Sequence, residues 1–140
     1  MIVLDANILI RGVLGRRVIP LLFRYGSEIQ FFAPDAAFAE AEEHLPTILL
    51  RRGFSISEAY DTFAIMGRIV EKVDKEAYTP FESAAKRRLI GRDLEDWPIL
   101  ATVLLLGSPL WTEDTDFFGV GIATWTTDRV EIFLHDSTNR

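Results

Sequence analysis

Apolar residues recur along this 140-residue chain in two patterns, short continuous runs and longer stretches with helical spacing. The short runs are typical of strands buried on both faces of a sheet, and they cover residues 1–4, 29–33, 110–112 and 121–125. The longer stretches predict helices over residues 7–14, 18–24, 36–52, 53–73, 81–90, 97–106 and 127–134. This alternation predicts an α/β three-layer sandwich, with helices on both faces of a mostly parallel sheet of four to five strands.

Polar residues and prolines at the ends of these stretches predict where helices begin and break. Asp35 is placed to cap the helix after the second strand, and Pro46 is expected to kink or restart it. Ser55 or Ser57 is expected to cap the following helix, and Thr127 the closing one.

Length and composition indicate one domain spanning residues 1–140, without a linker or an internal repeat. The chain has no cysteine, which excludes disulfides and thiolate metal sites and favours a cytoplasmic location. No apolar run approaches the roughly 20 residues needed to cross a bilayer, so no membrane association is expected. The first five residues carry no basic group ahead of their apolar run, which is unlike a signal peptide.

The formal net charge of −6 argues at first against a nucleic-acid ligand, because phosphate contacts usually require a basic surface. This argument weakens if several carboxylates share one site, since bound divalent cations would offset their charge. The apolar share of 49% is high for an isolated domain and suggests that a partner covers part of the surface.

Four acidic residues from remote segments are predicted to meet at one edge of the sheet. Asp5 directly follows the first strand, and Asp114 follows the strand over residues 110–112. Glu40 lies early in the helix after the second strand, and Asp96 lies at the start of an apolar helix. Because the carboxyl ends of parallel strands line one crevice, these carboxylates are expected to lie close together. Their repulsion calls for a cation, and oxygen-only donors suit Mg²⁺ or Mn²⁺.

Structural roles compete with this interpretation. Asp5 would also serve as a helix cap, and Asp114 and Asp116 would also serve as turn formers. Asp93 and Asp96 both flank a helix start, so one of them is a candidate cap and the other a candidate ligand.

Four segments in this order resemble the motifs of the PIN-domain family. The first motif of the family is an Asp that ends the first strand, with a small polar residue two positions later, and Asp5-Ala6-Asn7-Ile8-Leu9 resembles it. The second motif, an acidic residue on the helix after strand two, resembles Pro34 with Glu40-Ala41. The third and fourth resemble Arg92-Asp93-Leu94-Glu95-Asp96 and Trp111-Thr112-Glu113-Asp114-Thr115-Asp116-Phe117.

The resemblance implies an endoribonuclease that uses one or two Mg²⁺ or Mn²⁺ ions held by Asp5, Glu40, Asp96 and Asp114. It implies that Asp93 and Asp116 are outer or second-metal ligands, that Asn7 orients Asp5 by hydrogen bonding, and that Thr112 supports the site. Many small single-domain members of the family are toxins of toxin–antitoxin pairs. The resemblance therefore also implies a homodimer and a protein antitoxin.

Several alternatives stay open at the level of sequence. Glu40, Glu43 and His44 share one helix face, so Glu43 remains an alternative to Glu40. Phosphate contacts would have to come from local basic clusters, although a charged run is usually a solvated face; these clusters are Arg16-Arg17, Arg51-Arg52, Lys86-Arg87-Arg88 and Arg92. Arg92 and Arg88 are the candidate RNA contacts among them. A catalytically silent PIN-like binding module is the main alternative function. A haloacid-dehalogenase-type phosphatase is less favoured, because Asn7 stands where that chemistry needs a second aspartate.

Overall fold

A computed structural model describes residues 1–139 of the chain. Five strands within these residues form one all-parallel sheet with the order β3-β2-β1-β4-β5. The strands are β1 (Ile2–Leu4), β2 (Phe31–Pro34), β3 (Val70–Val73), β4 (Leu110–Trp111) and β5 (Thr124–Trp125). The predicted α/β class with a parallel central sheet is therefore confirmed.

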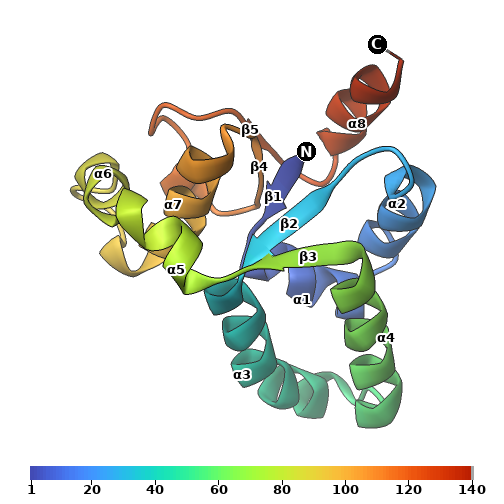
Figure 1. Cartoon of the computed structure of the whole chain (residues 1–140). Helices are drawn as coiled ribbons and strands as arrows, with labels where there is room; N and C mark the ends of the chain where they lie inside the picture. Colours follow the sequence, from blue (N-terminus) through green and yellow to red (C-terminus); the bar gives the residue numbers. More distant parts are fainter. Residues whose placement is uncertain (140) are drawn as a thin grey trace.

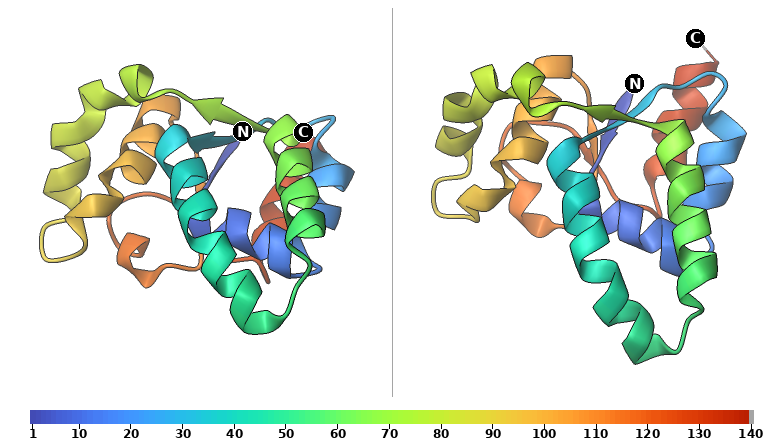
Figure 2. Two further views of the ribbon diagram at one scale, coloured as in Figure 1. Left: turned by 90° about the horizontal axis from the view of Figure 1, so that it is seen from below. Right: turned by 60° about the horizontal axis from the view of Figure 1, so that its bottom comes forward.

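Helices flank the sheet on both faces (Figures 1 and 2). Their bounds are α1 (Ala6–Leu14), α2 (Val18–Tyr25), α3 (Asp35–Arg52), α4 (Ile56–Ile69), α5 (Lys75–Tyr78), α6 (Glu82–Arg88), α7 (Trp97–Leu106) and α8 (Val130–Thr138). Helices α5, α6 and α7 lie on one side of the sheet, while α1, α2 and α4 lie on the other (Figure 1). Helices α3 and α4 project together from the sheet as an antiparallel pair (Figure 2).

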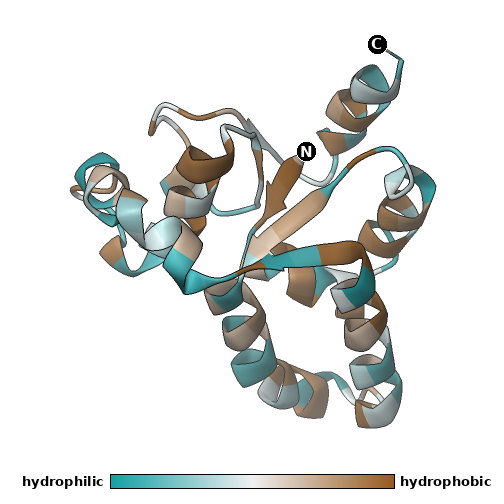
Figure 3. Ribbon diagram, in the orientation of Figure 1, coloured by the Kyte–Doolittle hydropathy of each residue, from teal (hydrophilic) through white to brown (hydrophobic). Residues whose placement is uncertain are grey.

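The core lies between the sheet and these helices. Strand β1 is completely buried, and α7 packs against β1 and β2 with most of its length apolar (Figure 3). Each fully buried Leu, Ile or Val side chain contributes about 1.5–3 kcal/mol relative to its exposed state. The β1–β4 centre of the sheet is therefore the rigid part of the molecule, and the acidic residues follow directly from it.

The register of β1 against β4 brings two remote polar residues together. Leu4 pairs with Trp111, and the Asp5 backbone N–H donates to the Trp111 carbonyl over 3.1 Å. Asp5 and Thr112 therefore leave the sheet side by side. Strand β2 ends at Pro34, and α3 begins there at the same edge (Figure 1).

Strand β3 was not predicted, because the helical spacing of apolar residues was extended through Val73. The structure ends α4 at Ile69 and pairs Val70–Val73 with β2. Within residues 1–139, β3 pairs with β2 alone, and its exposed Glu71 and Lys72 form the hydrophilic middle seen in Figure 3. Pairing with β2 outweighs the local pattern in this segment.

One further expectation about helix ends was wrong, and one was confirmed. Of the two effects expected of Pro46, a restart does not occur, because α3 continues through it and the carbonyl that loses its partner belongs to the exposed Glu42. The closing helix begins at Val130 rather than at Thr127, whose buried hydroxyl instead accepts from Trp111 Nε1 over 3.1 Å. Ser55 caps α4, as predicted, by accepting from the backbone of Glu58.

Asp35 is the first residue of α3 rather than its cap, since Pro34 occupies the cap position. Its carboxylate accepts from the Lys75 backbone N–H over 3.1 Å and from the Tyr78 hydroxyl over 2.6 Å. Asp35 therefore joins α3 to α5. Among the described residues, no helix is long and apolar enough to span a membrane.

Candidate active site

Asp5 is the most tightly held acidic residue of the sheet edge. Its side chain is 6% exposed, and Oδ1 accepts from the backbone N–H of Ala6 over 2.7 Å. Oδ2 accepts from Thr112 Oγ1 over 2.7 Å and from Asn7 Nδ2 over 3.2 Å. A carboxylate has about four acceptor positions, so three are occupied and the free one lies on Oδ1. Asp5 thus caps α1 and keeps one free acceptor position, held in a fixed place, that could bind a cation.

Asn7 and Thr112 connect the end of β1 to the segment after β4. Asn7 Oδ1 accepts from the Glu113 backbone N–H over 3.3 Å, while Thr112 Oγ1 accepts from the Asp114 N–H over 2.9 Å. Thr112 is completely buried at the end of the pair of strands. The two side chains therefore fix where Asp114 leaves the sheet relative to Asp5.

Three carboxylates lie close together at this edge of the sheet. One oxygen each from Asp96, Asp114 and Asp116 lies within 4.8 Å of the others. Asp114 Oδ1 also accepts from the Asp116 backbone N–H over 2.9 Å, which shapes the short 3₁₀ turn Thr115–Phe117. The turn-forming role of Asp114 and the carboxylate cluster therefore exist together.

The surroundings raise the pKa of Asp5 to about 6. Burial is the main cause, and the charges of Glu40 and Asp114 add to it. The hydrogen bonds from Thr112 and Ala6 act in the opposite direction.

The pKa of Asp96 is raised to about 7, again mainly by burial. The carboxylates that add to this effect are Asp93, Asp5, Asp114 and Glu40. A half-buried acid that titrates near neutrality, in a group of like charges, marks a place where a cation would be stabilising.

Glu40 belongs to this cluster of charges, and Glu43 does not. Glu40 acts electrostatically on both Asp5 and Asp96, although its own side chain is exposed on α3. Glu43 is one helical turn further along α3 and contributes to neither shift. The geometry therefore favours Glu40 of the two alternatives.

Asp93 and Asp96 divide two roles between them. Asp93 caps the 3₁₀ turn Leu94–Asp96 by accepting from the Glu95 backbone N–H over 3.0 Å. Asp96 occupies the cap position of α7, but its side chain makes no capping hydrogen bond. The carboxylate of Asp96 is thus left for the cluster.

The donor set fits a hard divalent cation. Asp96, Asp114 and Asp116 offer only oxygen ligands. Asp5 and Glu40, which were predicted as ligands, are not among the three that come within 4.8 Å of one another, but both act electrostatically on Asp96. Such an ion would relieve the repulsion among carboxylates, which adds to burial in raising the pKa values of Asp5 and Asp96.

A family model described as "PIN domain" matches residues 3–135 of the chain. This match covers nearly the whole sequence and all four acidic segments. The chain belongs to the PIN-domain family. PIN domains are generally nucleases that bind divalent metal through acidic residues, and the acidic cluster at this sheet edge is consistent with that.

Solved structures share the PIN fold with this chain at low sequence identity. A toxin–antitoxin complex from Klebsiella pneumoniae gives a TM-score of 0.66 at 21% identity, covering 91% of this chain and 98% of that one. VapBC2 from Rickettsia felis, bound to a DNA fragment from its promoter, gives 0.70 at 14% identity, with 90% and 98% covered. FitAcB from Neisseria gonorrhoeae gives 0.55 at 21%, with 91% and 98% covered. The comparison with curated proteins found no significant match.

In this PIN domain the two arginines predicted as RNA contacts hold the loop after β4. Arg92 Nη1 donates to the carbonyls of Thr115, Asp116 and Phe118 over 2.5–3.2 Å. Arg88 Nη1 donates to the carbonyls of Val120 and Gly121 over 3.0 and 3.2 Å. Both side chains therefore support the backbone that carries Asp116, and contact with RNA stays a prediction for each.

Three other arginines of this PIN domain lie beside Asn7 and Glu113, and of these only Arg51 and Arg52 belong to a basic cluster that the sequence offered for phosphate contacts. Arg11, Arg51 and Arg52 line a cavity that also includes Asn7 and Glu113. The pairs and runs of basic residues were visible in the sequence, but the contact between α1 and α3 that brings Arg11 opposite Arg51 was not.

Proposed function

We propose that this PIN domain is a metal-dependent endoribonuclease that hydrolyses RNA phosphodiester bonds. The approach of the Asp96, Asp114 and Asp116 carboxylates to within 4.8 Å carries the proposal. One or two Mg²⁺ or Mn²⁺ ions would be held there, with Asp5 and Glu40 completing the set and Asp93 as an outer contributor. When bound, such an ion activates a water molecule and stabilises charge on the phosphate under attack.

The residues of the chain have distinct tasks in this proposal. Asn7 and Thr112 occupy Oδ2 of Asp5 and leave Oδ1 to face the cation. Thr112 also positions the backbone of Asp114. The pKa of Asp96 is raised to about 7, so a cation would be held by its ionised form and would favour loss of its proton.

The chain has no cysteine, and both histidines are exposed, His44 on α3 and His135 on α8. The thiol and imidazole nucleophiles of other phosphodiesterases therefore have no counterpart among the clustered residues Asp96, Asp114 and Asp116. The PIN-family match also removes the support for a haloacid-dehalogenase-type phosphatase, and Asn7 donates to Asp5 rather than providing a second acid.

We also propose that the protein is the toxin of a toxin–antitoxin pair and forms a homodimer. The similar fold of the Klebsiella pneumoniae toxin–antitoxin complex supports the first part. The high apolar share of 49% supports a covered surface and so the second part. Light scattering that gives a monomer at all concentrations would contradict the dimer.

The nuclease proposal is tested by cleavage of a structured RNA in the presence of EDTA and after addition of manganese. We expect cleavage only with manganese, and a loss of at least about 100-fold in the Asp114→Asn variant. Asp61→Asn is the matched control, because Asp61 is exposed on α4 and contributes to neither raised pKa.

Metal-dependent cleavage that survives in Asp114→Asn would point to a contaminating nuclease and contradict the assignment. Manganese binding without cleavage of any RNA would favour the catalytically silent binding module instead.

A further inference from the structure

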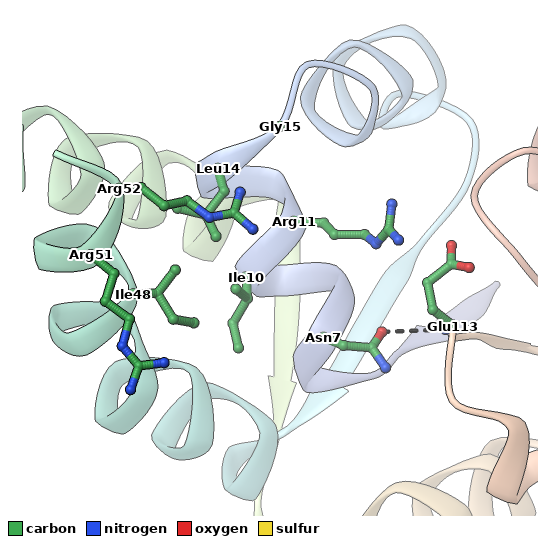
Figure 4. Close-up of a pocket in the computed structure, with 9 residues that line it drawn as sticks. All are labelled: Asn7, Ile10, Arg11, Leu14, Gly15, Ile48, Arg51, Arg52 and Glu113. Carbon is green, nitrogen blue, oxygen red and sulfur yellow. Dashed lines mark hydrogen bonds between the residues drawn. The ribbon is translucent and has the colours of Figure 1, made fainter. Parts of the chain in front are cut away.

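Three arginines line a groove at α1 and α3 that also includes Asn7 and Glu113 (Figure 4). We call it the arginine groove and define it by Asn7, Ile10, Arg11, Ile48, Arg51 and Arg52, which lie among its lining residues. Its volume is about 740 Å³. Arg51 and Arg52 extend from α3 and Arg11 extends from α1 (Figure 4).

Two residues of the groove are adjacent to the acidic residues of the sheet edge. Asn7, which lines it, donates to Oδ2 of Asp5. Glu113 also lines it and directly precedes Asp114 in the chain. The Glu113 carboxylate accepts from the Thr127 backbone N–H over 2.7 Å, which turns it toward the β5 side. An extended ligand at the cluster would therefore enter the groove on leaving it.

The groove arginines form no ion pair within residues 1–139, and one acid, Glu113, lines the groove with them. Within residues 1–139, the ion pairs join Arg24 to Glu131, Lys86 to Glu82 and His135 to Asp136, and none involves a groove arginine. All three arginines are exposed. Arg88 and Arg92 are bonded to backbone carbonyls, whereas the groove arginines form no ion pair and lie beside Asn7 and Glu113.

The length of the groove indicates an extended ligand. Arg51 lies about three helical turns after Glu40 on α3, which places it on the same face and about 16 Å further along the helix axis. A free phosphate ion cannot contact both ends of this path. A polyanionic strand can, with one phosphate at the cluster and its neighbours beside the arginines.

We propose that the arginine groove binds the backbone phosphates of the RNA strand that flank the bond to be cut, with Ile10 and Ile48 as an apolar floor under the nucleotides. This inference rests on the proposed nuclease function and extends it to the substrate path. It also explains how a chain of net charge −6 holds a polyanion, since local positive charge lies where the strand leaves the site.

The test is fluorescence anisotropy with a short labelled single-stranded RNA, in EDTA so that no cleavage occurs, at salt concentrations from about 50 to 200 mM. We expect the Arg51→Ala/Arg52→Ala variant to bind about tenfold more weakly at low salt. Its slope of log affinity against log salt should be shallower by about 1.4, since each lost contact to a single strand removes about 0.7.

Arg68→Ala/Arg87→Ala is the matched control, because it removes two exposed arginines that lie outside the groove. It should bind RNA as the wild type does. Equal unfolding midpoints for both variants exclude a folding defect. If Arg51→Ala/Arg52→Ala binds RNA like the wild type, the proposal is overturned.

A parallel titration with a labelled peptide of alternating leucine and glutamate distinguishes a protein occupant. Loss of peptide binding in Arg51→Ala/Arg52→Ala with unchanged RNA binding would assign the groove to a protein partner and overturn the proposal. A cleavage assay of the same proteins with manganese distinguishes a failure of the groove proposal from a failure of the proposed nuclease function. Groove-dependent RNA binding without cleavage would support the groove and contradict the proposed nuclease function, whereas cleavage with groove-independent binding would contradict the groove alone.

Discussion

Replacing Thr112 by valine tests how the site is held together. The substitution keeps the branched shape of the side chain and removes only the hydroxyl. That hydroxyl donates to Asp5 Oδ2 over 2.7 Å and accepts from the Asp114 N–H over 2.9 Å, in a position with no solvent exposure. Asp5 and the Asp114 N–H each lose a hydrogen bond. The loss of stability therefore has one part that depends on the charge of Asp5 and one part, from the Asp114 N–H, that does not.

The magnitude follows from these two bonds. A hydrogen bond to an ionised carboxylate is worth about 1.5–3 kcal/mol, and an unpaired backbone donor costs about 1–3 kcal/mol. The hydrogen bond from Thr112 lowers the pKa of Asp5, so its loss should raise that pKa above the present value of about 6. We expect Thr112→Val to lower the free energy of unfolding by about 3–4 kcal/mol where Asp5 is ionised, and by about 1–2 kcal/mol where it is protonated.

The assay is urea unfolding in EDTA at about pH 8 and about pH 5, on either side of the Asp5 pKa. Thr112→Ser is the matched control, because it keeps the hydroxyl and loses one methyl group, worth about 1 kcal/mol at either pH. An equal loss for Thr112→Val at the two pH values would refute the reasoning, since the hydroxyl would then not act on the carboxylate.

Three further outcomes are expected. In EDTA the free energy of unfolding should fall as pH rises from about 4 to about 7. The reason is that the raised pKa values of Asp5 and Asp96 let the folded state hold more protons than the unfolded chain. Urea unfolding that shows no such decline would contradict the raised pKa values. Glu40→Gln should weaken manganese binding in calorimetry about tenfold or more, and Glu43→Gln should not; the reverse result would favour Glu43. Arg92→Gln should speed amide hydrogen exchange in the loop after β4 and weaken manganese binding, and unchanged exchange would contradict its role in holding that loop.

The central strands were predictable because their patterns are strong and local. Strand β1 is a continuous apolar run that ends in a charge, and α7 has the bounds that its apolar stretch predicts. Strand β3 was not predictable in this way, since Val70 continues the helical spacing of α4 and the intervening Glu71 and Lys72 suit a helix surface equally well. Its pairing with β2 is a long-range effect that the local sequence does not contain.

Parts of the candidate site were likewise predictable from local sequence, and other parts depend on long-range packing. The placement of Asp5 and Asp114 after strands predicted that they would meet, because parallel strands share one carboxyl edge. The link through Thr112 depends on the register of β1 against β4, and the arginine groove depends on the packing of α1 against α3. Neither relation follows from the order of residues along the chain.

The most direct test of a metal site at the sheet edge is calorimetric titration of manganese into the wild type, Asp96→Asn and Asp61→Asn at about pH 8, above both raised pKa values. The account predicts binding by the wild type and Asp61→Asn, and loss of binding by Asp96→Asn. It also predicts that Asp96→Asn unfolds at a higher temperature than the metal-free wild type, because the variant removes a buried like charge, so the loss cannot come from misfolding. Undiminished binding by Asp96→Asn, or no binding by the wild type, would contradict the assignment of a metal site to this cluster.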